Sequence, residues 1–230
     1  PYDNILDVIY NDYSAAIERI DDSEEFEKAG EGLSDHIMTY AYRGKVKIDD
    51  PQDLFALFFA KAPLSLRKAG IESLGRVLYN SEGEVPVKIK DQFRRIWENR
   101  VAFHEKKQGS EIQELDGFGW WYASGKLDEP WALEQLILSL KMGALPDPEQ
   151  FVIDRLEKSV SVYPLRVAQA LILILDGSED EWLITGSKEE IRKIAEVVYN
   201  SSDSITKKTG KDLINRLVAK GYLEVRSLLN

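Results

Sequence analysis

Residues that begin and end α-helices alternate along almost the whole chain. An aspartate or serine that can cap a helix N-terminus, or a proline that fits the first helical turn, precedes most apolar segments, and a glycine follows several of them. Asp128 and Gly143 bracket one such segment, and Ser187 with Glu190 matches a capping box at the start of another. Apolar residues recur every three or four positions, so the pattern predicts roughly a dozen helices joined by short turns. The expected helices cover residues 3–20, 23–44, 54–60, 64–78, 88–107, 111–124, 128–142, 150–160, 165–175, 187–199, 203–220 and 222–229.

One continuously apolar segment, Leu171–Leu175, has the length of a buried β-strand. Pro164 and Gly177 bracket a unit of helical length around it, and the chain has no second β-branched run with which such a strand would pair. We therefore expect a helix at this place and an all-α protein.

Helices of this length with short connections are typical of α-solenoids, in which antiparallel helix pairs stack on one another. Gly70, Gly75, Gly117 and Gly119 lie within expected helices, where a missing side chain lets neighbouring helices approach closely. We expect a single helical-repeat domain over residues 1–230, of the HEAT or armadillo type. A compact multi-helix bundle is the alternative, because periodicity predicts helices better than it predicts their arrangement.

The composition argues against a nucleic-acid or membrane partner. Thirty Lys and Arg against 40 Asp and Glu give a net charge of −10, which opposes a phosphate backbone at long range. The chain has no cysteine, which excludes disulfides and thiol nucleophiles and fits a reducing compartment. No apolar stretch approaches the ~20 residues of a membrane span. The N-terminal residues lack the basic start and apolar stretch of a signal peptide. We therefore expect a cytoplasmic protein.

The sequence shows few groups suited to catalysis near neutral pH. Its two histidines, His36 and His104, are far apart, and neither lies in a recognised nucleophile context. We expect both to be solvated or to pack between helices. The expectation is a protein that is not an enzyme, with no catalytic residue, no metal site and no cofactor.

Asp49, Asp50 and Asp53 spell the pattern DDxxD, which resembles the magnesium–diphosphate motif of terpenoid synthases. In that family the carboxylates bind cations that hold a diphosphate. Here Pro51 would remove a helical hydrogen bond from the motif, and the family's second motif is missing. We favour a capping role, with Asp50 at the N-cap. A helical enzyme with a magnesium–diphosphate site at these three residues is one alternative function.

The segment 88–107 carries the strongest local positive charge. Nucleic-acid-binding helical repeats usually carry such charge on many successive repeats, whereas here it occurs once. We favour a solvated helix face with Glu–Arg pairs. A solenoid that binds nucleic acid through this helix is a second alternative. The basic residues are Lys88, Lys90, Arg94, Arg95, Arg100, Lys106 and Lys107, and the acidic ones are Asp91, Glu98 and Glu105.

Two adjacent tryptophans, Trp120 and Trp121, lie in a segment whose apolar face is otherwise formed by Leu115, Phe118 and Tyr122. At about 100° per residue the two indoles point to opposite flanks of that face. A helix lying on a single core would expose both of them. Either neighbouring helices pack on several sides, or one tryptophan contacts a protein partner, as Trp often does at interfaces.

Several stretches together resemble the C-terminal helical region of large multidomain prokaryotic proteins. Some members of that group carry a Sir2-like or nucleotide-triphosphatase module upstream, and antiviral defence is the role suspected for them. The resemblance implies a recognition or scaffolding segment whose catalytic modules lie elsewhere. The stretches are Phe58–Pro63, Leu74–Arg76, Trp97–Arg100, Phe118–Lys126, Trp131–Leu133, Leu213–Leu217 and Gly221–Glu224.

From these observations we expect a non-catalytic protein-interaction or scaffolding domain. Its partner would be a protein, whose identity the sequence does not reveal, and Trp120 and Trp121 are the candidate contact residues.

Overall fold

The computed structural model describes residues 39–43, 45–47, 49–107, 111–178 and 186–229, and this part of the chain is helical without any strand. It contains eleven helices, nine of them α-helices and two of them 3-10 helices, so the expected all-α class is confirmed here. The helices expected over residues 3–20 and over most of 23–44 lie outside the described residues. The helices are α3 (Leu54–Lys61), α4 (Leu64–Asn80), α5 (Val87–Lys107), η1 (Ile112–Gly117), α6 (Phe118–Ala123), α7 (Glu129–Lys141), α8 (Glu149–Ser159), α9 (Pro164–Gly177), α11 (Lys188–Tyr199), α12 (Ser204–Ala219) and η2 (Leu223–Leu229).

Aspartate caps begin several helices, as the sequence predicts. The side chain of Asp128 accepts a hydrogen bond from the backbone N–H of Trp131 at 3.2 Å, and Asp203 accepts one from that of Thr206 at 2.8 Å. Each bond satisfies an N–H that has no partner within its own helix. At the other end of α7, Gly143 has φ +98°, a left-handed conformation that disfavours residues with a side chain.

Two expected helix starts differ from the structure. Asp53 rather than Asp50 is the N-cap of α3, because its carboxylate accepts the N–H of Phe55 at 2.9 Å. The capping box at Ser187 does not form: α11 begins after Ser187, but the Ser187 hydroxyl is buried and makes no cap bond. Ser187 has φ −127° and ψ 31°, outside the extended conformation that an N-cap residue usually adopts.

The helix expected over residues 111–124 is divided into η1 and α6. In a continuous α-helix the Asp116 carbonyl would accept the N–H four residues later, but here it accepts the N–H of Asp147 at 2.9 Å. The loop before α8 therefore donates to a carbonyl that would be bonded within the helix if the helix were continuous. It also lies so close to Gly119 that a Cβ there would be 2.6 Å from the Asp147 carbonyl oxygen. The last expected helix is likewise a 3-10 helix, η2.

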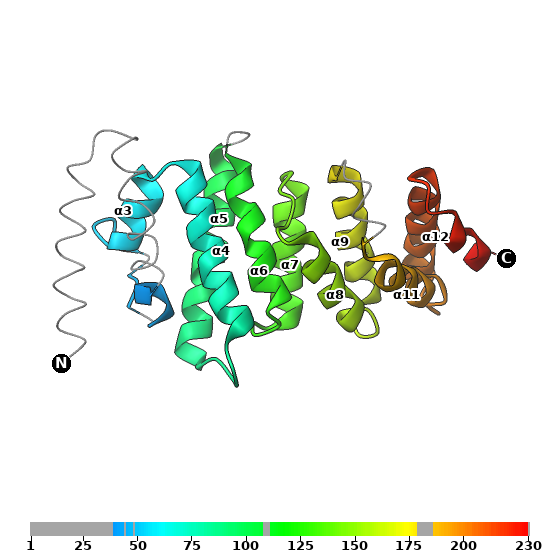
Figure 1. The fold of residues 1–230 in the computed structure, drawn as a ribbon, viewed down its shortest axis with the longest axis horizontal. Helices are drawn as coiled ribbons and strands as arrows, with labels where there is room; N and C mark the ends of the chain where they lie inside the picture. The colour runs from blue at the N-terminus through cyan, green and yellow to red at the C-terminus, as the bar shows by residue number, and fades with distance from the viewer. Residues whose placement is uncertain (1–38, 44, 48, 108–110, 179–185, 230) are drawn as a thin grey trace.

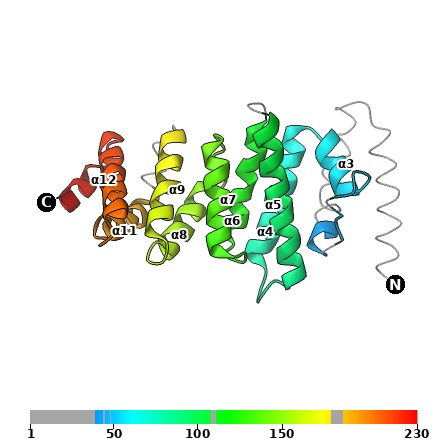
Figure 2. The same ribbon diagram turned by 180° about the vertical axis from the view of Figure 1, so that it is seen from behind.

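The helices follow one another in chain order along the longest dimension of the molecule (Figure 1). Helix α4 packs against α6, α6 against α8, and α8 against α11. A second series of contacts joins α5 to α7, α7 to α9, and α9 to α12. The view from behind shows the same order of elements (Figure 2). Contacts are thus made between helices that are close in the sequence.

The core is continuous between these two series of helices. Trp97 of α5 stacks on Phe118 of α6, with ring centroids 4.8 Å apart, and meets Trp131 of α7 edge-on at 5.6 Å. Farther along the chain, Leu171 and Ile174 of α9 have no exposed surface, so the apolar run weighed as a strand is a buried helix. None of the helices in the described ranges combines the length and the apolar composition that a bilayer crossing needs.

Candidate functional site

The surface formed by α4, α6 and α8 carries three aromatic rings in mutual contact, which we call the aromatic patch: Tyr79, Trp120 and Phe151. Tyr79 stacks on Phe151 with centroids 5.4 Å apart, and Trp120 meets both rings edge-on at 5.6 and 5.4 Å. Tyr79 is 41% exposed, and the other two side chains are partly buried. Each of these three helices contributes one ring, so the patch depends on the packing of all three.

The two adjacent tryptophans have different environments. Trp121 has no exposed surface, and its indole N–H donates to the Ile71 carbonyl at 2.7 Å. It also packs edge-on against Phe93 at 4.9 Å. Trp121 therefore belongs to the core and presents no surface to a partner, whereas Trp120 on the opposite flank reaches the aromatic patch.

The Trp120 ring is in contact with its neighbours, but its indole N–H makes no hydrogen bond to any residue that the structure describes. The guanidinium carbon of Arg76 lies 5.3 Å from the ring centroid, a distance at which a cation is attracted to the ring face. The indole nitrogen is shielded from solvent and has no acceptor among the described residues. Gly75 makes the close approach of α6 to α4 possible, because a Cβ there would lie 2.7 Å from Trp121 Cδ1 and still nearer to Trp120 Cβ.

An open hollow of about 450 Å³ adjoins Arg76 on α4. It shares Arg76 with the surroundings of Trp120, and Val77 on its wall is 43% exposed. The Arg76 side chain thus borders both the aromatic patch and this hollow. The hollow is lined by Tyr42, Ser73, Arg76, Val77, Asn80 and Ser81.

A buried ion cluster lies between α4, α5 and η1, with Glu114 at its centre. Glu114 is fully buried, and its carboxylate is 2.9 Å from Arg67 Nε, 2.5 Å from Arg100 Nε and 3.4 Å from His104 Nε2. Burial raises the pKa of Glu114, but hydrogen bonds from His104 and Arg100 and the charges of both arginines outweigh it, so the pKa is lowered. The carboxylate is therefore held ionised inside the fold. His104 packs between helices, as expected; His36 lies outside the described residues.

The three aspartates of the DDxxD pattern have separate roles. Both oxygens of the buried Asp53 carboxylate accept backbone N–H groups, from Phe55 at 2.9 Å and from Lys47 at 3.0 Å. Asp50 accepts the N–H of Gln52 at 3.0 Å, and Asp49 pairs with Arg95. Within the described ranges no three acidic, histidine or cysteine side chains are placed to hold a metal ion.

The basic residues of segment 88–107 are divided among different contacts in α5. Arg100 is buried against Glu114, and Arg95 pairs with Asp49. The Arg94 guanidinium lies 5.0 Å from the centre of the Trp131 ring. These three arginines therefore interact within the protein, and Arg100 is buried instead of lying on the solvated face that the sequence favours.

A second group of carboxylates surrounds Lys68 near η1. The Lys68 amino group lies 3.6 Å from Glu72, 3.7 Å from Asp116 and 3.6 Å from Asp147. Burial is the largest cause that raises the pKa of Asp116, to about 6, and the N–H of Leu145 and the charge of Lys68 oppose it. Burial and the charge of Asp147 likewise raise the pKa of Glu72. Asp116 thus changes charge close to neutral pH.

The chain matches no family model, and comparisons with curated proteins and with solved structures found no significant match. The resemblance to the C-terminal helical region of multidomain prokaryotic proteins stays a prediction.

Proposed function

We propose that the chain is an α-solenoid of antiparallel helix pairs, of the HEAT or armadillo type, and that it binds a protein partner without catalysing a reaction. Two series of packed helices, α4–α6–α8–α11 and α5–α7–α9–α12, support the solenoid, because repeat proteins bury their core between neighbouring units. The alternative arrangement is a compact bundle.

The observation that carries the binding role is the aromatic patch around Trp120. Tryptophan, tyrosine and arginine supply much of the binding energy at protein interfaces, and Trp120, Tyr79 and Arg76 meet here at the surface. The shielded N–H of Trp120 has no acceptor among the described residues, so the indole nitrogen adds no hydrogen bond to the fold there. A role in recognition explains why tryptophan occupies this position.

Trp120→Phe separates recognition from stability. The variant keeps a ring against Tyr79 and Phe151 and removes an N–H that has no acceptor in the described part of the chain, so we expect its melting temperature to stay within a few degrees of wild type. A protein captured from the native lysate by the wild-type chain should be lost or strongly reduced with Trp120→Phe. Val87→Ala, which alters a side chain that is 74% exposed on α5, is the control and should retain it. Capture of the same protein by all three chains, or a measured turnover, would contradict the proposal.

A further inference from the structure

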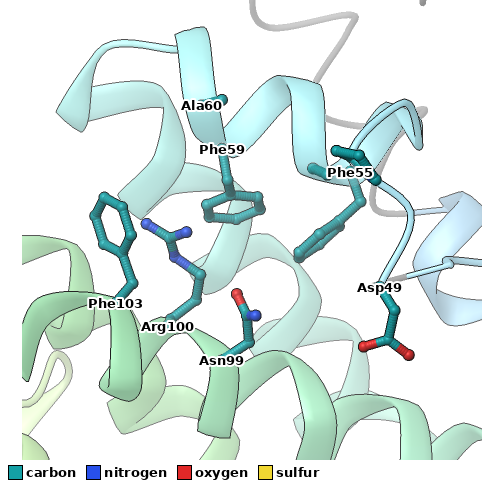
Figure 3. Close-up of a pocket in the computed structure, with 9 residues that line it drawn as sticks. Asp49, Phe55, Phe59, Ala60, Asn99, Arg100 and Phe103 are labelled. Atoms are coloured by element: carbon teal, nitrogen blue, oxygen red, sulfur yellow. The ribbon is translucent and has the colours of Figure 1, made fainter. Parts of the chain in front are cut away.

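A pocket of about 290 Å³ lies between α3 and α5, away from the aromatic patch. The phenyl rings of Phe55, Phe59 and Phe103 form much of its wall, and the Arg100 guanidinium lies between Phe59 and Phe103 (Figure 3). A space of this size has room for a small organic molecule. Its lining consists of Asp49, Pro51, Phe55, Ala56, Phe59, Ala60, Asn99, Arg100 and Phe103.

The position of Arg100 is fixed from three sides. Its guanidinium carbon is 4.8 Å from the centre of the Phe59 ring and 4.3 Å from that of Phe103. Its Nε and Nη2 donate to the two oxygens of Glu114 at 2.5 and 3.1 Å. The residue is only 5% exposed, so little rotamer freedom would be lost when a ligand binds.

The hydrogen-bonding capacity of Arg100 is not used completely. Its Nη1 has no acceptor within the described part of the chain, although a guanidinium has five N–H donors. Arg67, the other arginine on Glu114, has a second carboxylate in Glu111 at 2.5 Å. Arg100 shares Glu114 with Arg67 and has no second carboxylate partner among the residues that the structure describes, and the pocket lies beside it.

We propose that this pocket binds a small organic carboxylate whose body is aromatic or branched aliphatic. The carboxylate would accept from Arg100, since charge-assisted hydrogen bonds from arginine are strong, and the apolar body would lie against Phe55 and Phe59. The carboxylate of Asp49 does not oppose this arrangement, because it lies at the other end of the pocket, beyond Phe55, and is paired with Arg95 (Figure 3).

Phenylacetate, which has ten non-hydrogen atoms, is the probe, and neutral phenylacetamide has nearly the same shape. Ligand-observed NMR titration of the full chain measures both dissociation constants. We expect phenylacetate to bind at least about tenfold more tightly, which is a free-energy difference of about 1.4 kcal/mol. Equal affinities, or no saturable binding of phenylacetate, would overturn the proposal.

A pocket-filling variant shows where the probe binds. Ala60→Leu adds three carbon atoms to the pocket wall at an exposed position of α3, and leucine suits a helix nearly as well as alanine. Ala219→Leu makes the same change at an exposed position of α12 and is the matched control. We expect Ala60→Leu to weaken phenylacetate binding at least about tenfold and Ala219→Leu to leave it within about twofold. Unchanged affinity in Ala60→Leu would place the probe elsewhere and refute the site.

Discussion

Asp116→Asn changes the charge of one carboxylate while keeping its shape. The Asp116 side chain is 13% exposed and accepts the N–H of Leu145 at 2.8 Å, a bond that an asparagine oxygen can also accept. Burial raises the pKa of this carboxyl from 3.8 to about 6. The substitution therefore removes the titration and preserves the hydrogen bond that links η1 to the loop before α8.

The direction of the pH effect follows from proton binding. Between the unfolded pKa of 3.8 and the folded value of about 6, the folded chain holds a proton that the unfolded chain releases. The stabilisation that comes from the protonated carboxyl is thus complete below pH 3.8, the pKa in the unfolded chain. It is lost as the pH rises through about 6, the pKa in the folded chain. The pKa shift of Asp116 changes the free energy of unfolding by about 3 kcal/mol in total. About 2 kcal/mol of this change occurs between about pH 4.5 and 7.5.

Chemical denaturation of both chains at these two pH values measures the effect. The free energy of unfolding of Asp116→Asn minus that of wild type should rise by about 2 kcal/mol from about pH 4.5 to 7.5. Asp203→Asn is the control: hydrogen bonds from Thr206 lower the pKa of Asp203, so its charge-dependent stability is lost only at more acidic pH. The difference between that variant and wild type should stay nearly constant. A difference for Asp116→Asn that also stays constant, or falls, would refute the reasoning.

Three further experiments test other parts of the structure. Glu114→Gln leaves the buried Arg100 without a charged partner among the described residues, whereas Arg67 keeps Glu111. The variant should cost about 3–5 kcal/mol in chemical denaturation, against about 0–1 for Glu134→Gln on the surface, and equal losses would contradict the buried ion cluster. Gly75→Ala forces a Cβ against Trp120 and should cost about 1–3 kcal/mol in thermal denaturation; an unchanged melting temperature would mean that α4 and α6 are not in close contact. Calorimetry with magnesium and diphosphate should give no binding heat, and heat that disappears in Asp50→Ala would instead favour the enzyme alternative.

Local signals predicted the helices well because they act within one turn. Asp128 and Asp203 cap helices through backbone groups only a few residues away, so the sequence pattern contains the whole interaction. Asp116 shows the limit: its carbonyl accepts from Asp147, far along the chain, and no periodicity reveals that η1 and α6 are separate helices. The capping box at Ser187 failed because a sequence pattern does not specify the backbone angles that such a cap needs.

The candidate sites were predictable only in part. The sequence predicted that Trp120 and Trp121 lie on opposite flanks of their helix. Their different burial depends on how α4 and α8 pack against that helix, and the pattern of a single segment does not specify this packing. The buried ion cluster was missed although a signal was present. Arg100 and His104 continue the spacing of the apolar stripe at Trp97 on the same helix, and charged or polar residues on such a face often form buried pairs.

Small-angle X-ray scattering tests most directly whether the helices stack in an extended array. A compact domain of 230 residues has a radius of gyration of about 17 Å. Helices that succeed one another along a single axis predict a clearly larger value and an asymmetric distribution of interatomic distances with a long tail (Figure 1). A radius near the compact value, with a symmetric distribution, would contradict the solenoid and favour a bundle.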